Sequence, residues 1–394
     1  MTSGSRSRVS QRAVLAWALF AFAFLLFLCS LLVFFSAPTG WLWIVAIIVG
    51  EWGHYVALAA FVLAAVSLRF GSVGRLTSAV AVAAAALCLS PVIRAGFIAV
   101  SLPERCTDAF GDAAPAVART GPLSLRGLIL GVRAPEVEVT EHEYAQNGRK
   151  ALKLDLYRSR GVEMPQPLIV VVHGGSWNGG DKKELPAINR YLAGQQYAVA
   201  SINYRHAPKH PFPAAVEDVF RAIEFLRMNA GELRIDATRI VLLGRSAGGQ
   251  IALSAAYAGK DPAVRGVVAF YAPTDLVLGY EKPSRRGVLD SKRALEGYLG
   301  GAPSQAPDRY AAASPANFIN AATPMTLLIH GGLDPIVWPI HSELAASRLE
   351  AANRPHLYLH VPWATHGCDA NLSGPSGQLS LYAINRFLAA ALRQ

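Results

Sequence analysis

Residues 240–249 read IVLLGRSAGG, an apolar run followed by a serine between small residues. The run predicts a buried strand, and the small residues predict a tight turn into a helix. Gly244 and Gly248 lie two positions on either side of Ser246, where a sharp turn leaves no room for larger side chains. The Ser246 oxygen would then protrude at a helix N-terminus, which favours developing negative charge. A glycine-rich surface turn with a solvated hydroxyl also fits this stretch, so other parts of the chain must decide.

Two later strands end in the residues that a serine nucleophile requires. The apolar run 325–329 leads into a turn with Asp334, and the run 356–361 leads into a loop with His366. Serine is a weak nucleophile at neutral pH and needs a base, which in turn needs an orienting group. Asp334 can hold one ring nitrogen of His366 while the other nitrogen takes the serine proton.

A third motif supplies backbone donors for a developing oxyanion. After the apolar run 168–172 comes His-Gly-Gly-Ser-Trp, residues 173–177, whose glycines let the main chain approach a substrate carbonyl. The predicted donors are the N–H groups of Gly174, Gly175 and Ala247. Ser176 and Trp177 are the predicted substrate contacts. His173 is expected to brace the loop.

The pattern of apolar runs predicts an α/β fold with a mostly parallel sheet and helices on both faces. The expected strands are a hairpin of 136–139 with 151–157, followed by 168–172, 198–203, 240–243, 264–270, 325–329 and 356–361. The expected helices are 213–228, 250–258, 341–352 and 378–392. This domain would occupy residues 136–394, with 276–313 as a possible lid or a long surface excursion.

These motifs together resemble the α/β-hydrolase superfamily, in particular its carboxylesterase branch with the BD-FAE and hormone-sensitive-lipase-like esterases. Further similarity lies in Asn-Tyr-Arg at 203–205, Pro-Phe-Pro-Ala at 211–214 and Tyr-Ala-Pro-Thr-Asp-Leu at 271–276. The resemblance implies Ser246 as nucleophile, Asp334 as acid and His366 as base, with an acyl-enzyme intermediate. Ser176 stands where a three-glycine oxyanion loop has its third glycine. Since arylformamidases share this loop form, amide-type substrates and acyl transfer remain alternatives to ester hydrolysis.

The N-terminal part of the chain predicts a membrane region. Hydrophobic residues make up 52% of the chain and charged residues only 16%, against about a quarter in soluble domains. We expect three transmembrane helices at about 13–36, 41–68 and 76–93, within a membrane region 1–102 and before a linker 103–135. A cleaved signal peptide would account for one such segment but not for three.

Basic residues at the ends of the expected spans predict the orientation. Arg6, Arg8 and Arg12 precede the first span, and Arg69 and Arg75 separate the second from the third, so both groups belong inside. With three spans the protein is an integral, multi-pass membrane protein whose hydrolase domain is extracytoplasmic. With two spans that domain would be cytoplasmic.

Charge and motifs restrict the partners. The net charge is +10, divided equally between residues 1–105 and the rest, without a dense basic cluster, so nucleic acid is not expected as a partner. The expected partners are a small-molecule or glycan- or lipid-linked ester and the lipid bilayer, with the oligomeric state open. The motifs predict no metal and no cofactor.

Four residues outside the hydrolase motifs raise separate questions. Glu51 and His54 stand three apart inside an expected span, which favours helix packing or headgroup binding. Cys106 and Cys368 could form a disulfide if the domain is extracytoplasmic. A third class of function also stays open at this point, a noncatalytic membrane protein whose hydrolase-like domain binds a ligand.

Overall fold

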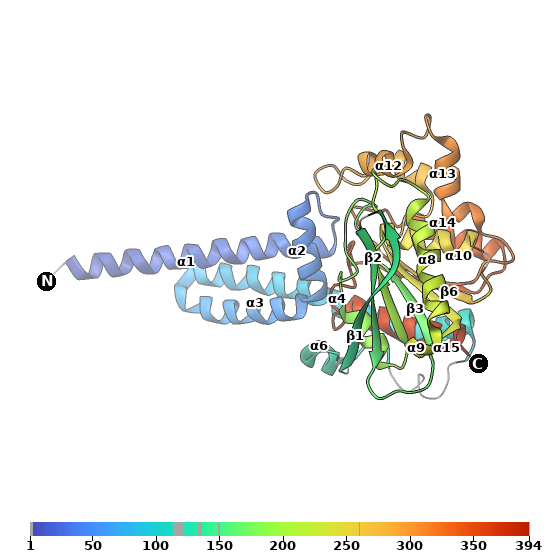
Figure 1. Cartoon of the computed structure of the whole chain (residues 1–394). Helices are drawn as coiled ribbons and strands as arrows, with labels where there is room; N and C mark the ends of the chain where they lie inside the picture. Colours follow the sequence, from blue (N-terminus) through green and yellow to red (C-terminus); the bar gives the residue numbers. More distant parts are fainter. Residues whose placement is uncertain (1–2, 113–120, 133–135, 149, 260, 394) are drawn as a thin grey trace.

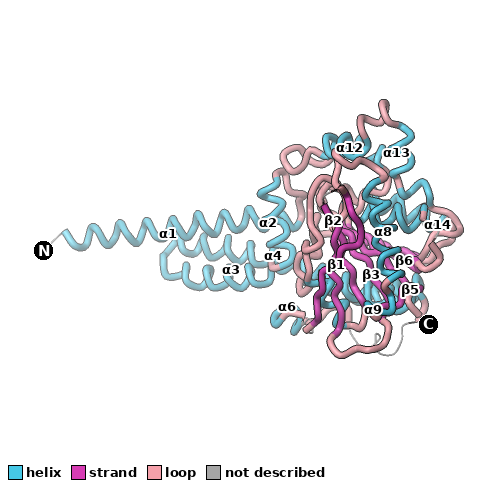
Figure 2. The backbone as a smooth tube through the Cα atoms, viewed as in Figure 1, coloured by secondary structure: helices cyan, strands magenta, loops and turns pink. Residues whose placement is uncertain are grey.

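The computed structural model describes residues 3–112, 121–132, 136–148, 150–259 and 261–393. An α/β domain carries a projection of long helices on one side (Figure 1). The N-terminus lies at the far end of the projection, away from the domain. The projection contains helices only, whereas all the strands lie within the domain (Figure 2).

The domain is built on one eight-stranded sheet with the order β1-β2-β4-β3-β5-β6-β7-β8. The strands are β1 (Val137–Asn147), β2 (Lys150–Ser159), β3 (Gln166–Val172), β4 (Ala198–Ile202), β5 (Ile235–Arg245), β6 (Val264–Phe270), β7 (Met325–Gly331) and β8 (His356–Val361). β2 is antiparallel to both of its neighbours, and the pairs from β4 to β8 are parallel. Every predicted apolar run is therefore a strand, and the predicted hairpin is confirmed.

Helices cover both faces of the sheet, which explains why its strands are apolar on both sides. One face packs against α8 (Ala214–Met228) and α10 (Ala247–Ala258), together with α14 (Ile340–Ala351). The other face packs against α7 (Ala187–Gly194), α15 (Pro375–Ala391) and the last part of α4 (Gly71–Phe110). The shorter helices are α6 (Leu125–Leu130), α9 (Ala230–Leu233), α11 (Leu276–Glu281), α12 (Ser291–Leu299), α13 (Pro307–Ala313) and η3 (Pro315–Phe318).

The projection contains α1 (Ser3–Ser30), α3 (Gly53–Ser67) and the first part of α4. The 3-10 turn η1 (Leu31–Val33) follows α1, and the 3-10 turn η2 (Leu68–Phe70) follows α3. Along the chain, α2 (Gly40–Glu51) lies between η1 and α3. α4 is 40 residues long, which corresponds to about 60 Å of helix. Its last part buries Leu102, Cys106 and Phe110 in the domain core, so one helix joins the projection to the domain.

The structure corrects the expected spans. Residues 41–68 form two helices, because α2 ends at Glu51 and α3 begins at Gly53. A Cβ on Gly53 would stand 2.4 Å from the Cys88 carbonyl oxygen, so this glycine lets α3 approach α4 closely. Among the described residues, two rather than three segments are long and apolar enough to cross a membrane, Gln11–Val33 and Gly53–Phe110. The second segment contains both α3 and α4.

The expected linker, residues 103–135, is only partly described. α4 continues through its first residues to Phe110, and α6 occupies 125–130, whereas 113–120 and 133–135 lie outside the described residues. The expected division at 102/103 thus falls within a helix. Residues 276–313, the possible lid, contain α11, α12 and α13.

Candidate active site

Ser246 lies in the turn between β5 and α10, as the glycine pattern predicts. Its backbone is in a left-handed conformation, with φ 53° and ψ −123°. Such a conformation is strained for a residue with a side chain and is typical of a nucleophile elbow. A Cβ on Gly244 would lie 2.2 Å from the Gly248 oxygen, and one on Gly248 would lie 2.2 Å from the His173 oxygen. The two glycines therefore make this turn sterically possible.

The structure brings Ser246, His366 and Asp334 together. The Ser246 Oγ lies 3.0 Å from Nε2 of His366. Nδ1 of the same ring lies 2.6 Å from Oδ2 of Asp334. Asp334 follows β7 and His366 follows β8, so both come from loops at the carboxyl edge of the sheet, the same edge at which β5 ends. This chain of hydrogen bonds can carry a proton away from the serine hydroxyl.

Asp334 is held in its ionised form. Its side chain is fully buried, which opposes ionisation, but attraction to His366 and hydrogen bonding to His330 and His366 outweigh burial. The pKa of Asp334 is consequently lowered to about 2. Its second oxygen, Oδ1, accepts the backbone N–H groups of Ile336 and Val337 at 2.8 and 2.9 Å. A fixed, charged carboxylate of this kind orients the imidazole and stabilises its protonated form.

The glycine loop after β3 faces the serine turn. Among the described residues, the N–H groups of Gly175 and Ala247 have no hydrogen-bond partner. The Gly174 N–H, in contrast, donates to Oε2 of Glu184 at 2.8 Å. Burial lowers the pKa of His173 to about 4, and its Nδ1 lies 2.7 Å from the Gly174 carbonyl oxygen. Two of the three predicted oxyanion donors are thus free, and the third is engaged.

A narrow cavity adjoins Ser246. Ser176 and Trp177, the predicted substrate contacts, both line it. Its volume accessible to water is about 40 Å³, whereas the neighbouring cavity over α12 measures about 780 Å³ and shares Ser176, Leu289 and Ala294 with it. Residues of the segment 276–313 supply about half of the narrow cavity's lining. The segment therefore forms much of the wall of the cavity beside Ser246.

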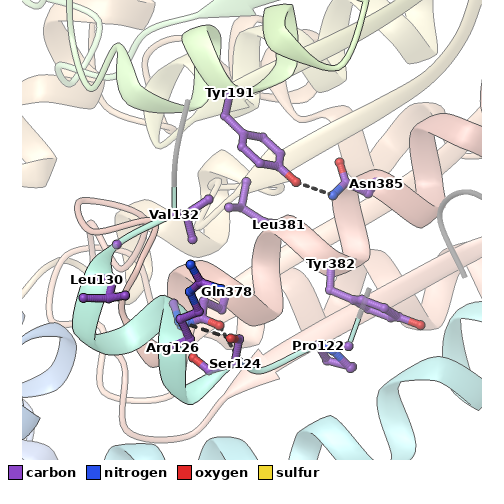
Figure 3. A pocket seen from close by; sticks show the side chains of 13 residues that line it. Pro122, Ser124, Arg126, Leu130, Val132, Tyr191, Gln378, Leu381, Tyr382 and Asn385 are labelled. Carbon is purple, nitrogen blue, oxygen red and sulfur yellow. Dashed lines mark hydrogen bonds between the residues drawn. The ribbon is translucent and has the colours of Figure 1, made fainter. Parts of the chain in front are cut away.

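A separate cavity of about 520 Å³ lies between α6, α7 and α15 (Figure 3). Arg126, Gln378 and Tyr382 are among its lining residues, and Asn385 donates to the Tyr191 hydroxyl at 2.7 Å. None of the residues of the serine site lines it.

The sequence motifs missed several groups around His366. The Tyr271 ring lies 4.3 Å from the imidazole ring, and its hydroxyl donates to Asp369 at 2.5 Å. Asp369 also pairs with the buried Arg245, which precedes Ser246 in the chain. Trp43 of α2 also donates from Nε1 to the His366 carbonyl oxygen at 2.8 Å. Their separation along the chain left no local pattern that would reveal these contacts.

The remaining expectations concern cysteines, metals and the Glu51–His54 pair. All four cysteines are free thiols, so Cys106 and Cys368 form no disulfide in the structure. In the described part of the chain, no group of three or more His, Cys, Asp or Glu is placed to hold a metal ion. Glu51 and His54 belong to different helices: Ser376 N–H donates to Glu51, and His54 Nε2 lies 3.0 Å from the Leu128 carbonyl oxygen.

Comparison with known proteins identifies the relatives of the domain. The BD-FAE family profile matches residues 154–349, which include Ser246 and Asp334 but end before His366. The carboxylesterase NlhH of Mycobacterium tuberculosis is 34% identical over 128 residues, covering 32% of this chain and 40% of that protein. Esterase LipC of the same organism is 29% identical over 255 residues, covering 60% of this chain and 61% of that protein.

Solved structures agree on the fold. A thermostable esterase from Pseudomonas putida superposes with a TM-score of 0.57 at 19% identity, over 74% of this chain and 98% of that protein. The chain spans 40% to 61% of the length of the two curated relatives above. The domain therefore has the α/β-hydrolase fold and is related to carboxylesterases, whereas the helical projection lies outside the matched family profile.

Proposed function

We propose that this chain is a membrane-anchored serine hydrolase that cleaves carboxylic esters. The observation that carries the proposal is the hydrogen-bonded series Ser246, His366 and Asp334 beside a narrow cavity. Relationship to carboxylesterases supports the same reaction class. The noncatalytic alternative gives no reason for a strained serine within hydrogen-bonding distance of a paired histidine.

The reaction proceeds in two halves. Nε2 of His366 takes the proton of Ser246 while Oγ attacks the acyl carbon, and the N–H groups of Gly175 and Ala247 stabilise the resulting oxyanion. His366 then returns the proton to the leaving alcohol, and an acyl-enzyme remains. In the second half, His366 deprotonates a water molecule that attacks the acyl-enzyme, and the carboxylic acid leaves as Ser246 regains its proton. Gly174 contributes by holding the loop through Glu184.

The cavity sizes support a short acyl group. The cavity of about 40 Å³ next to Ser246 is far smaller than the 300–1,000 Å³ usual for drug-sized ligands. The adjoining cavity of about 780 Å³ can take a larger alcohol, such as a glycan- or lipid-linked one. We therefore expect acetyl esters to be cleaved faster than esters of long acyl chains.

Attachment to a membrane rests on the apolar surface of the projection. The most apolar 18-residue stretches of Gln11–Val33 and Gly53–Phe110 have mean hydropathies of 2.6 and 2.1. Large apolar side chains along these helices are exposed, including Phe22, Leu58 and Phe61. Residues 53–70 measure about 27 Å as a helix, close to the hydrocarbon thickness of a bilayer. The helices α1, α3 and α4 would then each cross the membrane. α3 and α4 together make up the second of the two long apolar segments, Gly53–Phe110.

The direction of the helices supports an extracytoplasmic domain. α1 starts at the far end of the projection and runs towards the domain, and α3 runs back away from the domain to the turn where α4 begins, which lies short of the N-terminus (Figure 1). Arg12, Arg69 and Arg75 thus belong to the end away from the domain, and basic residues favour the cytoplasmic side. A C-terminal alkaline phosphatase fusion should be active and a green fluorescent protein fusion dark; the reverse result refutes this orientation.

Kinetics of the full-length protein in detergent test the reaction. We expect turnover of p-nitrophenyl acetate to exceed that of the octanoate, and Ser246→Ala to abolish both. Ser201→Ala, at a buried serine in β4, is the matched control and should retain activity. Full turnover by Ser246→Ala would refute the catalytic assignment. Faster cleavage of N-formyl aryl substrates than of esters would instead favour the formamidase alternative.

A further inference from the structure

α2 contacts the loop that carries His366. The indole Nε1 of Trp43 donates to the His366 carbonyl oxygen at 2.8 Å, and the two rings lie 6.4 Å apart. One turn further along α2, Ile47 lies against Gly367, where a Cβ would come within 3.4 Å of Ile47 Cδ1. The N-terminal part of the chain therefore touches the backbone at the histidine itself.

The other end of α2 contacts the continuation of the same loop. Glu51 is only 1% exposed, and its Oε2 accepts the Ser376 N–H at 3.2 Å, in the first turn of α15. Asn371 donates from Nδ2 to the Glu51 carbonyl oxygen at 3.1 Å. A carboxylate at a helix N-terminus meets unpaired N–H groups and a favourable dipole. Both ends of α2 thus bind the stretch 366–376.

Two more contacts surround this interface. The Arg94 guanidinium of α4 lies 5.6 Å from the ring of Trp363, which is buried in the loop before His366. The turn between α1 and α2 reaches the possible lid, where the Gly40 N–H donates to the Gly287 carbonyl oxygen at 2.9 Å. The N-terminal helices thus contact both the histidine loop and the cover of the cavity.

We propose that α2 is a positioning element of the active site and that Trp43 is its positioning residue for His366. This inference rests on the proposed function. The imidazole must meet Ser246 and Asp334 at the same time, but residues 362–374 contain neither helix nor strand to fix the backbone. The Trp43 hydrogen bond supplies that fixation from outside the hydrolase domain. The N-terminal helical region therefore contributes to turnover through α2 as well as to attachment.

Because the Trp43 hydrogen bond ends on the backbone of His366, we expect its loss to lower kcat strongly. His366 uses both ring nitrogens at 2.6 and 3.0 Å, so a shift of its backbone disturbs both contacts. Displacement of a catalytic group by about 1 Å can cost about 100-fold in rate. Tyr271 also packs against the imidazole, but it holds the ring and not the carbonyl. We expect loss of the Trp43 donor to lower kcat by about tenfold, a partial displacement.

Trp43→Phe in the full-length protein tests the proposal, because phenylalanine keeps an aromatic ring and removes the N–H. Trp41→Phe is the matched control, since Trp41 lies in the same helix and is 83% exposed. kcat and KM for p-nitrophenyl acetate are measured per active site, counted by titration with a fluorophosphonate. The rate at which the fluorophosphonate labels Ser246 is a second readout that needs no ester substrate.

The proposal expects kcat per titrated site and the labelling rate to fall about tenfold in Trp43→Phe, with KM within twofold and Trp41→Phe unchanged. Unchanged kcat per site, or an equal loss in Trp41→Phe, overturns it. A lower total activity that is fully explained by a smaller fraction of titratable active sites also overturns the proposal, since this result indicates a purely structural role for Trp43. If the wild-type protein reacts with the fluorophosphonate but cleaves no ester, the ester proposal fails, and the labelling rates still decide the role of Trp43.

Discussion

Replacing Asp334 with asparagine tests the buried end of the hydrogen-bonded series. Oδ1 of Asp334 accepts two backbone N–H groups, from Ile336 and Val337, and Oδ2 faces Nδ1 of His366 at 2.6 Å. An asparagine must keep its carbonyl oxygen on the two backbone donors. Its NH2 group is then turned towards Nδ1 of the histidine.

The consequence is the wrong tautomer of His366. Nδ1 becomes the acceptor, the ring proton moves to Nε2, and Nε2 can no longer take the proton of Ser246. In serine proteases the equivalent exchange lowers kcat by about 10⁴-fold with the geometry intact. We expect a loss of about 10³ to 10⁴-fold here, or about 4 to 5.5 kcal/mol of transition-state stabilisation at 1.36 kcal/mol per tenfold.

Initial rates with p-nitrophenyl acetate, normalised to titrated active sites, measure this loss. Asp275→Asn is the matched control, because Asp275 caps α11 by accepting the Leu278 N–H at 3.0 Å and an asparagine can do the same. The control should stay within about twofold of the wild-type rate, as expected for a preserved cap. An Asp334→Asn protein that keeps more than a tenth of the wild-type kcat would refute the argument from the tautomer.

Three further predictions concern stability. Because the pKa of Asp334 is lowered from 3.8 to about 2, its ionised form stabilises the fold above about pH 4, and this contribution is lost as the pH falls towards 2. The Tm difference between the wild type and Asp334→Asn should therefore shrink as the pH falls from about 4 to about 2, and a constant difference would contradict this prediction. Gly248→Ala should lower the Tm by several degrees, because its Cβ would meet two carbonyl oxygens within 2.3 Å, whereas Gly231→Ala, with open space around it, should not; equal values contradict this. A chain that starts at residue 125 lacks the buried Leu102 and Phe110 and should elute as an aggregate in size-exclusion chromatography, whereas one that starts at residue 90 should elute as a defined species.

The fold and the proximity of Ser246, His366 and Asp334 could be predicted from the sequence because their signals are local. The strands from β3 to β8 each contain a short apolar run, and alternation marks the hairpin of β1 and β2. Ser246, Asp334 and His366 follow the runs of β5, β7 and β8 within a few positions. Since the carboxyl ends of parallel strands meet at one edge of a sheet, the order of the motifs was enough to bring the three side chains together.

Contacts between distant segments could not be predicted in this way. Pro91 and Pro103 in α4 favour a break, yet tertiary packing keeps one helix across both. The engagement of Gly174 by Glu184 depends on a loop conformation that no periodicity encodes. Glu51 appeared to belong to a span, but its partner, Ser376, lies 325 positions away. Hydropathy indicates that such a helix is apolar and does not identify the surface it covers.

The long separation between Trp43 and His366 has a consequence for biosynthesis. These residues are 323 positions apart, so at 5–20 residues per second the ribosome needs about 16 to 65 s between them. For the last 120 residues of this interval the nascent chain already contains α2, the glycine loop and Ser246, but it lacks His366. Ser246 can therefore meet its histidine partner only near the end of synthesis, when the loop that carries His366 packs against both Ser246 and α2.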